Sequence, residues 1–194
     1  MILNGLYRVL LACKNCRPDS GSPCRDCKRS ISRIGTESID RRLRNDHCTV
    51  LHMAAALDHQ SFLGQLLRRE NLNLCARDDM GLTPLIIAAM NGRHGNVKLL
   101  LGCGAECGVD MKSDNGDTAL SHAVWAGDYK IVHLLVNSGR VKDLTDKAGK
   151  PLHHLARDTG VKRLLTELER RGDGVSANMP ALISNGSNKR NPLN

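Results

Sequence analysis

Four copies of one tetrapeptide recur at a nearly constant spacing along this chain. Their first residues lie 34, 35 and 32 residues apart, and the copies are Thr49-Val50-Leu51-His52, Thr83-Pro84-Leu85-Ile86, Thr118-Ala119-Leu120-Ser121 and Lys150-Pro151-Leu152-His153. Small residues and then a pair of leucines follow each copy. A period of about 33 residues with this core is typical of two-helix units stacked in a row. Such a stack presents an extended interaction surface rather than an enclosed catalytic pocket.

A threonine opens three of the four tetrapeptides and predicts the start of a helix. The hydroxyl of an N-cap Thr accepts a hydrogen bond from a first-turn amide that has no partner inside the helix. Pro84 suits the following position, because its missing N–H costs nothing there and its φ is already helical. Gly92 and Gly127 predict the end of the first helix, since glycine tolerates a positive φ.

A second helix is expected in each unit. Its apolar residues recur at the i, i+3, i+4 spacing of one buried face, and they are Phe62/Leu63/Leu66, Val97/Leu100 and Ile131/Val132/Leu135. Turn-forming residues separate the units, in the segments 77–81, 113–116 and 146–149. Each unit is therefore predicted to consist of two helices joined by a tight turn, followed by a protruding hairpin.

The segment from Arg77 to Ala89 carries Asp-x-x-Gly-x-Thr-Pro-Leu in phase with the repeat. In this and in its phased tetrapeptides, the sequence resembles the ankyrin repeat family over roughly residues 45–171. The resemblance implies an all-α solenoid of helix-turn-helix units with connecting β-hairpin loops, in four repeats at about 45–78, 79–113, 114–146 and 147–171. The fourth repeat has Lys150 in place of the capping Thr and is shortened. We therefore expect it to be a terminal cap or a frayed half-repeat.

The residues outside the repeats divide into a Cys-rich basic arm, 1–44, and a tail, 172–194. The tail is rich in Gly, Ser and Asn without periodicity, which predicts disorder. Residues 1–48 hold ten Lys and Arg against five Asp and Glu. These charges are typical either of a solvated arm or of a segment that contacts phosphates or directs nuclear import. A third interpretation takes Leu3, Leu6, Val9 and Leu10 as the second helix of an incomplete repeat.

The arm contains the one candidate metal site of the sequence, in two Cys-x-x-Cys pairs. Four thiolates at this kind of spacing can bind Zn²⁺ tetrahedrally, and they would come from Cys13, Cys16, Cys24 and Cys27. The loop between the pairs is shorter than the roughly 15–20 residues usual in such sites. The alternatives are thus a compact structural zinc knuckle and four unliganded cysteines. The remaining cysteines, among them Cys75, are interpreted as small thiols in a reducing compartment.

The resemblance also implies where a partner would bind. In ankyrin repeat proteins this is the concave face, formed by the hairpin tips and the last residues of each first helix. Carried over to this sequence, the partner-binding residues are Asp79, Met80, Leu82, Met90, Asn91, Asp114, Asn115, Asp117, Trp125, Lys147 and Arg157. Trp125 is the only tryptophan. It either anchors an interface from an outward position or packs over the neighbouring unit.

These features together predict a non-catalytic protein–protein interaction module, an adaptor or regulator in the cytoplasm or nucleus. We find no Gly-rich phosphate loop, nucleophile elbow or phased carboxylate pair, so we expect no enzyme, no catalytic residues and no cofactor beyond the arm's zinc. No apolar run approaches the roughly 18 residues that a membrane helix needs, so we expect no membrane partner. The alternative is a nucleic-acid-associated regulator, in which the arm binds nucleic acid and the repeats recruit a protein. No aromatic residues interleave with the basic clusters, which disfavours a platform for stacked bases.

Overall fold

The computed structural model describes residues 48–69, 72–104 and 108–171. In chain order, the helices are α3 (Val50–Ala56), α4 (Gln60–Leu66), α5 (Pro84–Met90), α6 (His94–Gly102), α7 (Ala119–Ala126), α8 (Tyr129–Asn137), the 3-10 helix η4 (Leu152–His154) and α9 (Thr159–Arg171). The described segments contain no extended strand, and an isolated bridge pairs Thr145 with Pro151. The expected all-α ankyrin-type solenoid is confirmed.

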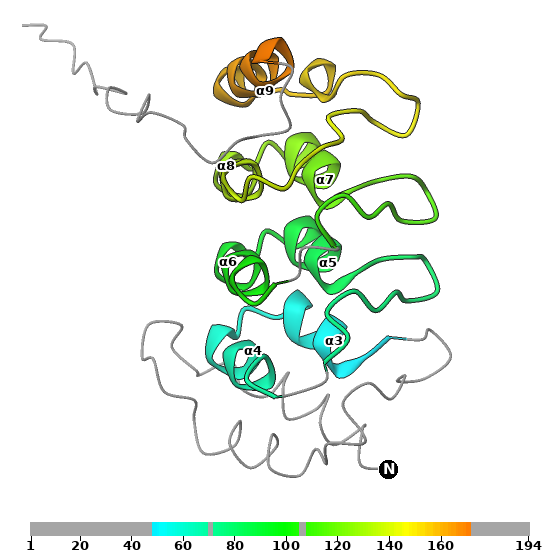
Figure 1. Cartoon of the computed structure of the whole chain (residues 1–194), viewed down its shortest axis with the longest axis vertical. Coiled ribbons are helices and arrows are strands. Elements are labelled where there is room, and N and C mark those ends of the chain that lie inside the picture. The colour runs from blue at the N-terminus through cyan, green and yellow to red at the C-terminus, as the bar shows by residue number, and fades with distance from the viewer. Residues whose placement is uncertain (1–47, 70–71, 105–107, 172–194) are drawn as a thin grey trace, which may run out of the picture.

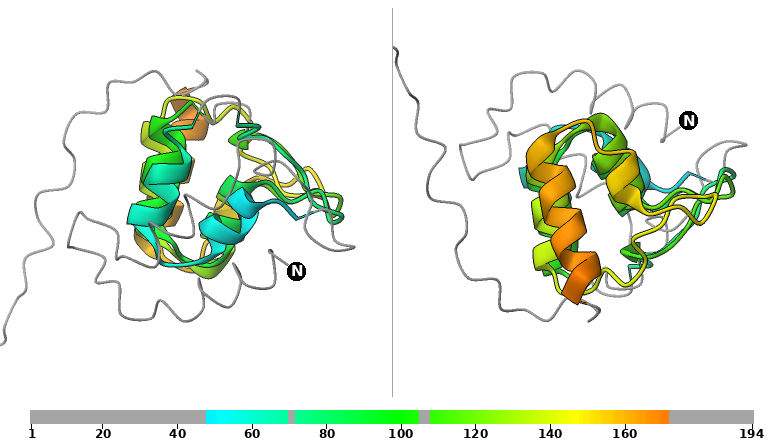
Figure 2. Two further views of the ribbon diagram at one scale, coloured as in Figure 1. Left: turned by 90° about the horizontal axis from the view of Figure 1, so that it is seen from below. Right: turned by 90° about the horizontal axis from the view of Figure 1, so that it is seen from above.

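The helices form two parallel columns (Figure 1). The first helices of the repeats, α3, α5 and α7 with η4, form one column, and the second helices α4, α6, α8 and α9 form the other. In views along the stack, the loops between repeats project together to one side, from the first column (Figure 2). The chain thus exposes two distinct surfaces, one on the loops and first helices and one on the outer faces of the second helices.

Three first helices begin at the predicted threonines. The hydroxyls of Thr49, Thr83 and Thr118 each accept a hydrogen bond from the amide three residues later, as the tetrapeptide predicts. His52 adds a second layer of bonds, because its Nδ1 accepts from the Thr49 amide at 3.1 Å. Its Nε2 lies 3.1 Å from the carbonyl oxygens of both Ala76 and Leu82. The imidazole therefore ties the start of α3 to the loop that leads into α5.

The core is aliphatic and continuous along the stack. The tetrapeptide leucines Leu51, Leu85, Leu120 and Leu152 are all buried, one in each repeat. Helix α5 lies between α3 and α7 and buries every residue from Pro84 to Ala89, as expected for a helix that is apolar around its circumference. Small side chains such as Ala54, Ala88 and Ala123 are also buried, and they let neighbouring first helices approach closely.

The fourth repeat departs from the others at the position of the missing threonine. Its first helix is reduced to the single 3-10 turn η4, and its N-cap, Pro151, makes no side-chain capping bond. The second helix, α9, is by contrast the longest of the described helices. The Nδ1 of His153 in η4 lies 2.7 Å from a carboxylate oxygen of Glu169 in α9. This contact links the two halves of the terminal repeat.

Several expectations concern residues outside the described segments or differ from what those segments contain. The arm with Cys13, Cys16, Cys24 and Cys27, and the tail from residue 172, lie outside them, so the zinc knuckle stays a prediction. Cys75 was expected to be a reduced thiol, but it is disulfide-bonded in the structure. Within the described residues, no group of three or more His, Cys, Asp or Glu side chains is arranged to hold a metal ion. No helix among them is both long enough and apolar enough to cross a membrane.

Candidate protein-binding surface

Exposed apolar side chains gather on the surface formed by the loops and first helices. Trp125 exposes 65% of its surface, Met80 56% and Met90 48%. Met90 and Trp125 occupy equivalent positions, near the ends of α5 and α7, seven residues after the capping threonines Thr83 and Thr118. Because α5 and α7 pack against each other, these two side chains lie on adjacent units of the same column.

The outward position of Trp125 follows from the helix geometry. Helix α7 buries Ala119, Leu120, Ala123 and Val124 and exposes Trp125 and Ala126 in its last turn. Gly127 then ends the helix with a φ of 70°, as expected for a C-terminal glycine. Trp125 therefore contributes little to the core. Of the two positions that the sequence allows for Trp125, the structure has the outward one and not the one packed over the neighbouring unit.

The expectation that Leu82 belongs to the binding surface is wrong, because Leu82 is buried, with 9% of its surface exposed. The amide of Leu82 donates to Asp78 Oδ1 at 2.8 Å, and its carbonyl oxygen lies 3.1 Å from His52 Nε2. These two bonds hold the segment before Thr83 against the preceding repeat, so the Leu82 side chain is not available to a partner. Leu155 was not anticipated on the surface, yet 36% of it is exposed. It follows η4, where the helix that would bury this position is missing.

The polar residues expected at the binding surface differ in whether they already form contacts within the protein. Asp79, Asn115, Lys147 and Arg157 are exposed, and Asp117 is half-buried. Asp114 is exposed but forms an ion pair with Arg77 at 2.8 Å. Asn91 donates from its side chain to the Ile87 carbonyl oxygen at 2.8 Å, so it also caps the end of α5.

The loops of the second and third repeats are fastened to each other. The Asp114 amide donates to the Met80 carbonyl oxygen at 3.0 Å, beside the Arg77–Asp114 ion pair. Gly81 lies between them with a φ of 69°. A Cβ atom on Gly81 would meet the Asp114 amide nitrogen at 2.8 Å, so only glycine allows the two loops to approach this closely.

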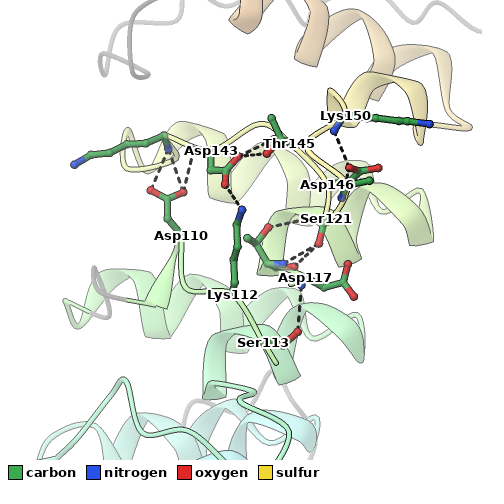
Figure 3. A network of polar contacts seen from close by, with 12 residues as sticks. Asp110, Lys112, Ser113, Asp117, Ser121, Asp143, Thr145, Asp146 and Lys150 are labelled. Carbon is green, nitrogen blue, oxygen red and sulfur yellow. Dashed lines mark hydrogen bonds and ion pairs between the residues drawn. The ribbon is translucent and has the colours of Figure 1, made fainter. Parts of the chain in front are cut away.

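A polar network fastens the loop that leads into α7 to the loop that leads into η4 in the same way (Figure 3). Lys112 Nζ lies 2.7 Å from Asp143 Oδ2, and Asp110 accepts from the Lys142 amide with both carboxylate oxygens at 3.1 Å. The hydrogen bond to Asp143 and the negative charge of that carboxylate raise the pKa of Lys112. Burial of Asp143 opposes its ionisation, yet hydrogen bonds from Lys112 and Thr145 outweigh this and leave its pKa below the ordinary value. The loops are thus held in place before any partner binds, which lowers the ordering cost of association.

Comparison with known proteins identifies the repeat. Two overlapping segments, residues 10–111 and 51–148, match the family model described as ankyrin repeats, three copies. Neurogenic locus notch homolog protein 2 of Homo sapiens is 36% identical over 96 residues, which cover 50% of this chain and 4% of that protein. Target of rapamycin complex 2 subunit AVO2 of Saccharomyces cerevisiae is 32% identical over 93 residues, covering 48% of this chain and 21% of that protein. Ankyrin repeat and KH domain-containing protein 1 of Homo sapiens is 32% identical over 108 residues, covering 56% and 4%.

The similarity covers only a part of each of these relatives. The chain spans between 4% and 21% of the length of the three relatives named above. The family model covers more than half of the chain, includes the three threonine-capped tetrapeptides and begins within the N-terminal arm, at residue 10. Ankyrin repeats are in general protein–protein interaction modules, and this chain belongs to the ankyrin repeat family.

Proposed function

We propose that this protein is a non-catalytic adaptor or regulator that binds a partner protein along the loops and first helices of its repeats, in the cytoplasm or nucleus. The observation that supports this most directly is the exposure of Trp125, flanked on the adjacent unit by Met90 and, on the preceding loop, by Met80. Exposed aromatic and Met side chains are enriched at the centres of protein interfaces. The fastened loops around them give the surface a fixed shape.

The charges along this surface suggest how a partner would be oriented. Asp79 and Asp117 lie on the loops of the second and third repeats, whereas Lys147 and Arg157 lie on the fourth. A partner with basic residues facing the second repeat and acidic residues facing the fourth would match both ends. Such complementarity mainly sets register and association rate rather than raw affinity.

The experiment that tests the proposal compares two variants of the full chain. A partner is captured from cell extract, purified and titrated against the wild type, Trp125→Ala and Arg68→Ala, at an exposed position just after α4. Trp125→Ala should weaken binding by about 2 kcal/mol if Trp125 is an interface anchor, while Arg68→Ala should bind as the wild type does. Equal affinity of all three proteins for every purified partner would refute the placement of the binding surface.

A further inference from the structure

The second-helix column carries a groove that the proposed function does not use. The groove is open, has a volume of about 580 Å³ and lies between α6 and α8. Its lining includes His94, Lys98, Tyr129, Lys130, His133 and Leu134. The fully buried residues of the two helices, such as Val97 and Leu100 or Ile131 and Leu135, are not among its lining. The groove therefore lies on the outer face of this column, whereas the loops project from the other column (Figure 2).

The lysines of the groove carry positive charge, and no Asp or Glu residue is among its lining residues. Helices α6 and α8 contain one lysine each, Lys98 and Lys130, and no Asp or Glu. Both lysines are exposed, and neither forms an ion pair within the described part of the chain. Asp128, the N-cap of α8, is already engaged, because it lies 2.8 Å from His94 Nε2 and accepts from the Ile131 amide at 3.1 Å.

The positive charge continues onto the next helix of the column. A second groove of about 370 Å³ lies along α9 and is lined by Lys162, Arg163 and Arg170 together with Glu167. Helix α9 contains four Lys and Arg against two Glu. One of these, Glu169, pairs with His153. Exposed basic side chains thus occur on each of the helices α6, α8 and α9 of this column.

The interior of the first groove is apolar as well as basic at its edges. Leu134 and the ring of Tyr129 contribute carbon surface to it, and both are only partly covered by the core. Tyr129 packs against His133 with ring centroids 5.9 Å apart and a tilt of 32°. An apolar side chain entering here would bury carbon surface, while lysines at the rim would meet negative charge on either side of it.

We propose that this groove is a second binding site, which takes an acidic peptide segment with an apolar side chain between its acidic residues. An acidic peptide matches both properties, because aspartate or glutamate reaches Lys98 and Lys130 while the apolar residue enters between Tyr129 and Leu134. A single-stranded nucleic acid fits less well, since such sites stack successive bases on several aromatic side chains. Tyr129 is the one Phe, Tyr or Trp residue on the two helices that form this groove.

The test uses the full chain and a fluorescein-labelled peptide, Asp-Glu-Asp-Leu-Glu-Asp-Glu, read by fluorescence anisotropy. The double variant Lys98→Glu with Lys130→Glu should weaken binding by at least about tenfold. The matched control is Lys142→Glu with Lys150→Glu, which changes net charge equally on the loops and should bind as the wild type does. A peptide with Ser in place of Leu should bind several-fold more weakly, and one with Gln in place of each acid should not bind.

Further measurements separate a loss of binding from a loss of folding and locate the bound peptide. If the charge-reversed pair fails to give the wild-type circular dichroism spectrum, Lys98→Gln with Lys130→Gln replaces it and should also weaken binding. In amide NMR spectra, the peptide should shift resonances of α6 and α8 and leave those of the loops unchanged. Equal binding by the groove and control variants, or shifts confined to the loops, would overturn the proposal. The proposal would also be overturned by another ligand that binds the wild type more tightly than the peptide does and does not bind the groove variant. The ligands to test are a single-stranded oligonucleotide and phosphatidylserine vesicles.

Discussion

The side-chain nitrogen of Asn96 in α6 lies 2.5 Å from the carbonyl oxygen of Leu57, in the preceding repeat. The same Nδ2 is 3.1 Å from the Ala55 carbonyl oxygen and 3.2 Å from that of Ala54. Asn96 is buried, and the carbonyls at the end of α3 have no partner within their own helix, as at any helix C-terminus. Asn96 therefore supplies the bonds that close α3.

Replacing Asn96 with Ala should destabilise the repeat array by about 1–3 kcal/mol, because buried carbonyl oxygens lose their donor. Asn96→Asp should cost more, since a carboxylate faces the same carbonyls and has no N–H to offer. Urea unfolding followed by circular dichroism measures both changes. Asn115→Ala, at an exposed loop position, is the control and should change the free energy of unfolding by less than about 0.5 kcal/mol. An equal effect of Asn96→Ala and Asn115→Ala would contradict this role.

His52 should make the stability of the array fall on acidification. Burial lowers its pKa, although hydrogen bonds to Leu82 and Ala76 and the nearby Asp78 oppose this. The unfolded chain therefore binds a proton at higher pH than the folded one, and stability contributed by neutral His52 is lost as the pH falls through about 6.5. The slope cannot exceed about 1.4 kcal/mol per pH unit for one proton. The free energy of unfolding, measured from pH 8 to pH 5, should fall more steeply for the wild type than for His52→Gln.

Gly81 and Gly127 form a matched pair for testing the contact between loops. Both have a φ near 70°, so Ala at either position should cost about 1–2 kcal/mol through backbone strain. A Cβ atom at Gly127 meets nothing within 4 Å, whereas one at Gly81 meets the Asp114 backbone. Gly81→Ala should therefore destabilise more than Gly127→Ala, as measured by thermal unfolding. If the two variants are equally stable, the loops are not in tight contact.

The terminal repeat should open first, and restoring its cap should slow the opening. In a solenoid, stability is close to a sum over units and their interfaces, so a unit with a defective first helix opens most readily. Amides of residues 150–171 should exchange hydrogen faster than those of α5. Lys150→Thr places a capping hydroxyl before Pro151 and should stabilise the repeat by about 0.5–2 kcal/mol, which slows exchange there. Lys147→Thr, the same change at an exposed loop position, should leave the exchange rates as they are.

The parts of this fold that depend on nearby residues could be predicted from the sequence. Thr49, Thr83 and Thr118 cap helices because the cap and its acceptor amide are three residues apart. For Trp125, the resemblance to ankyrin repeats implies an outward position, while the sequence leaves open that it packs over the neighbouring unit. Local rules of this kind fix the helix starts and the order of units along the array.

The parts that depend on contacts between repeats could not be predicted. Leu82 was expected on the surface, because a residue next to a loop tip gives no local sign that its backbone bonds turn it inward. Asn96 occupies the place that Ile131 fills in the next repeat, and nothing near it in sequence indicates three carbonyl acceptors from the preceding unit. In the sequence, Lys98 and Lys130 look like ordinary solvent-exposed helix residues. Only the packing of α6 beside α8 brings both of them to one groove.

The fastening of each loop to the next has a consequence for which partners this surface can accept. The ion pair between Arg77 and Asp114 joins two of its loops, and the bonds of Asp110 and Lys112 to Lys142 and Asp143 join the next two. A protein that needs a flatter or a more bent surface must break one of these links before it can make full contact. The array therefore acts as a template that discriminates by shape, and partners whose contour already matches it bind without that penalty.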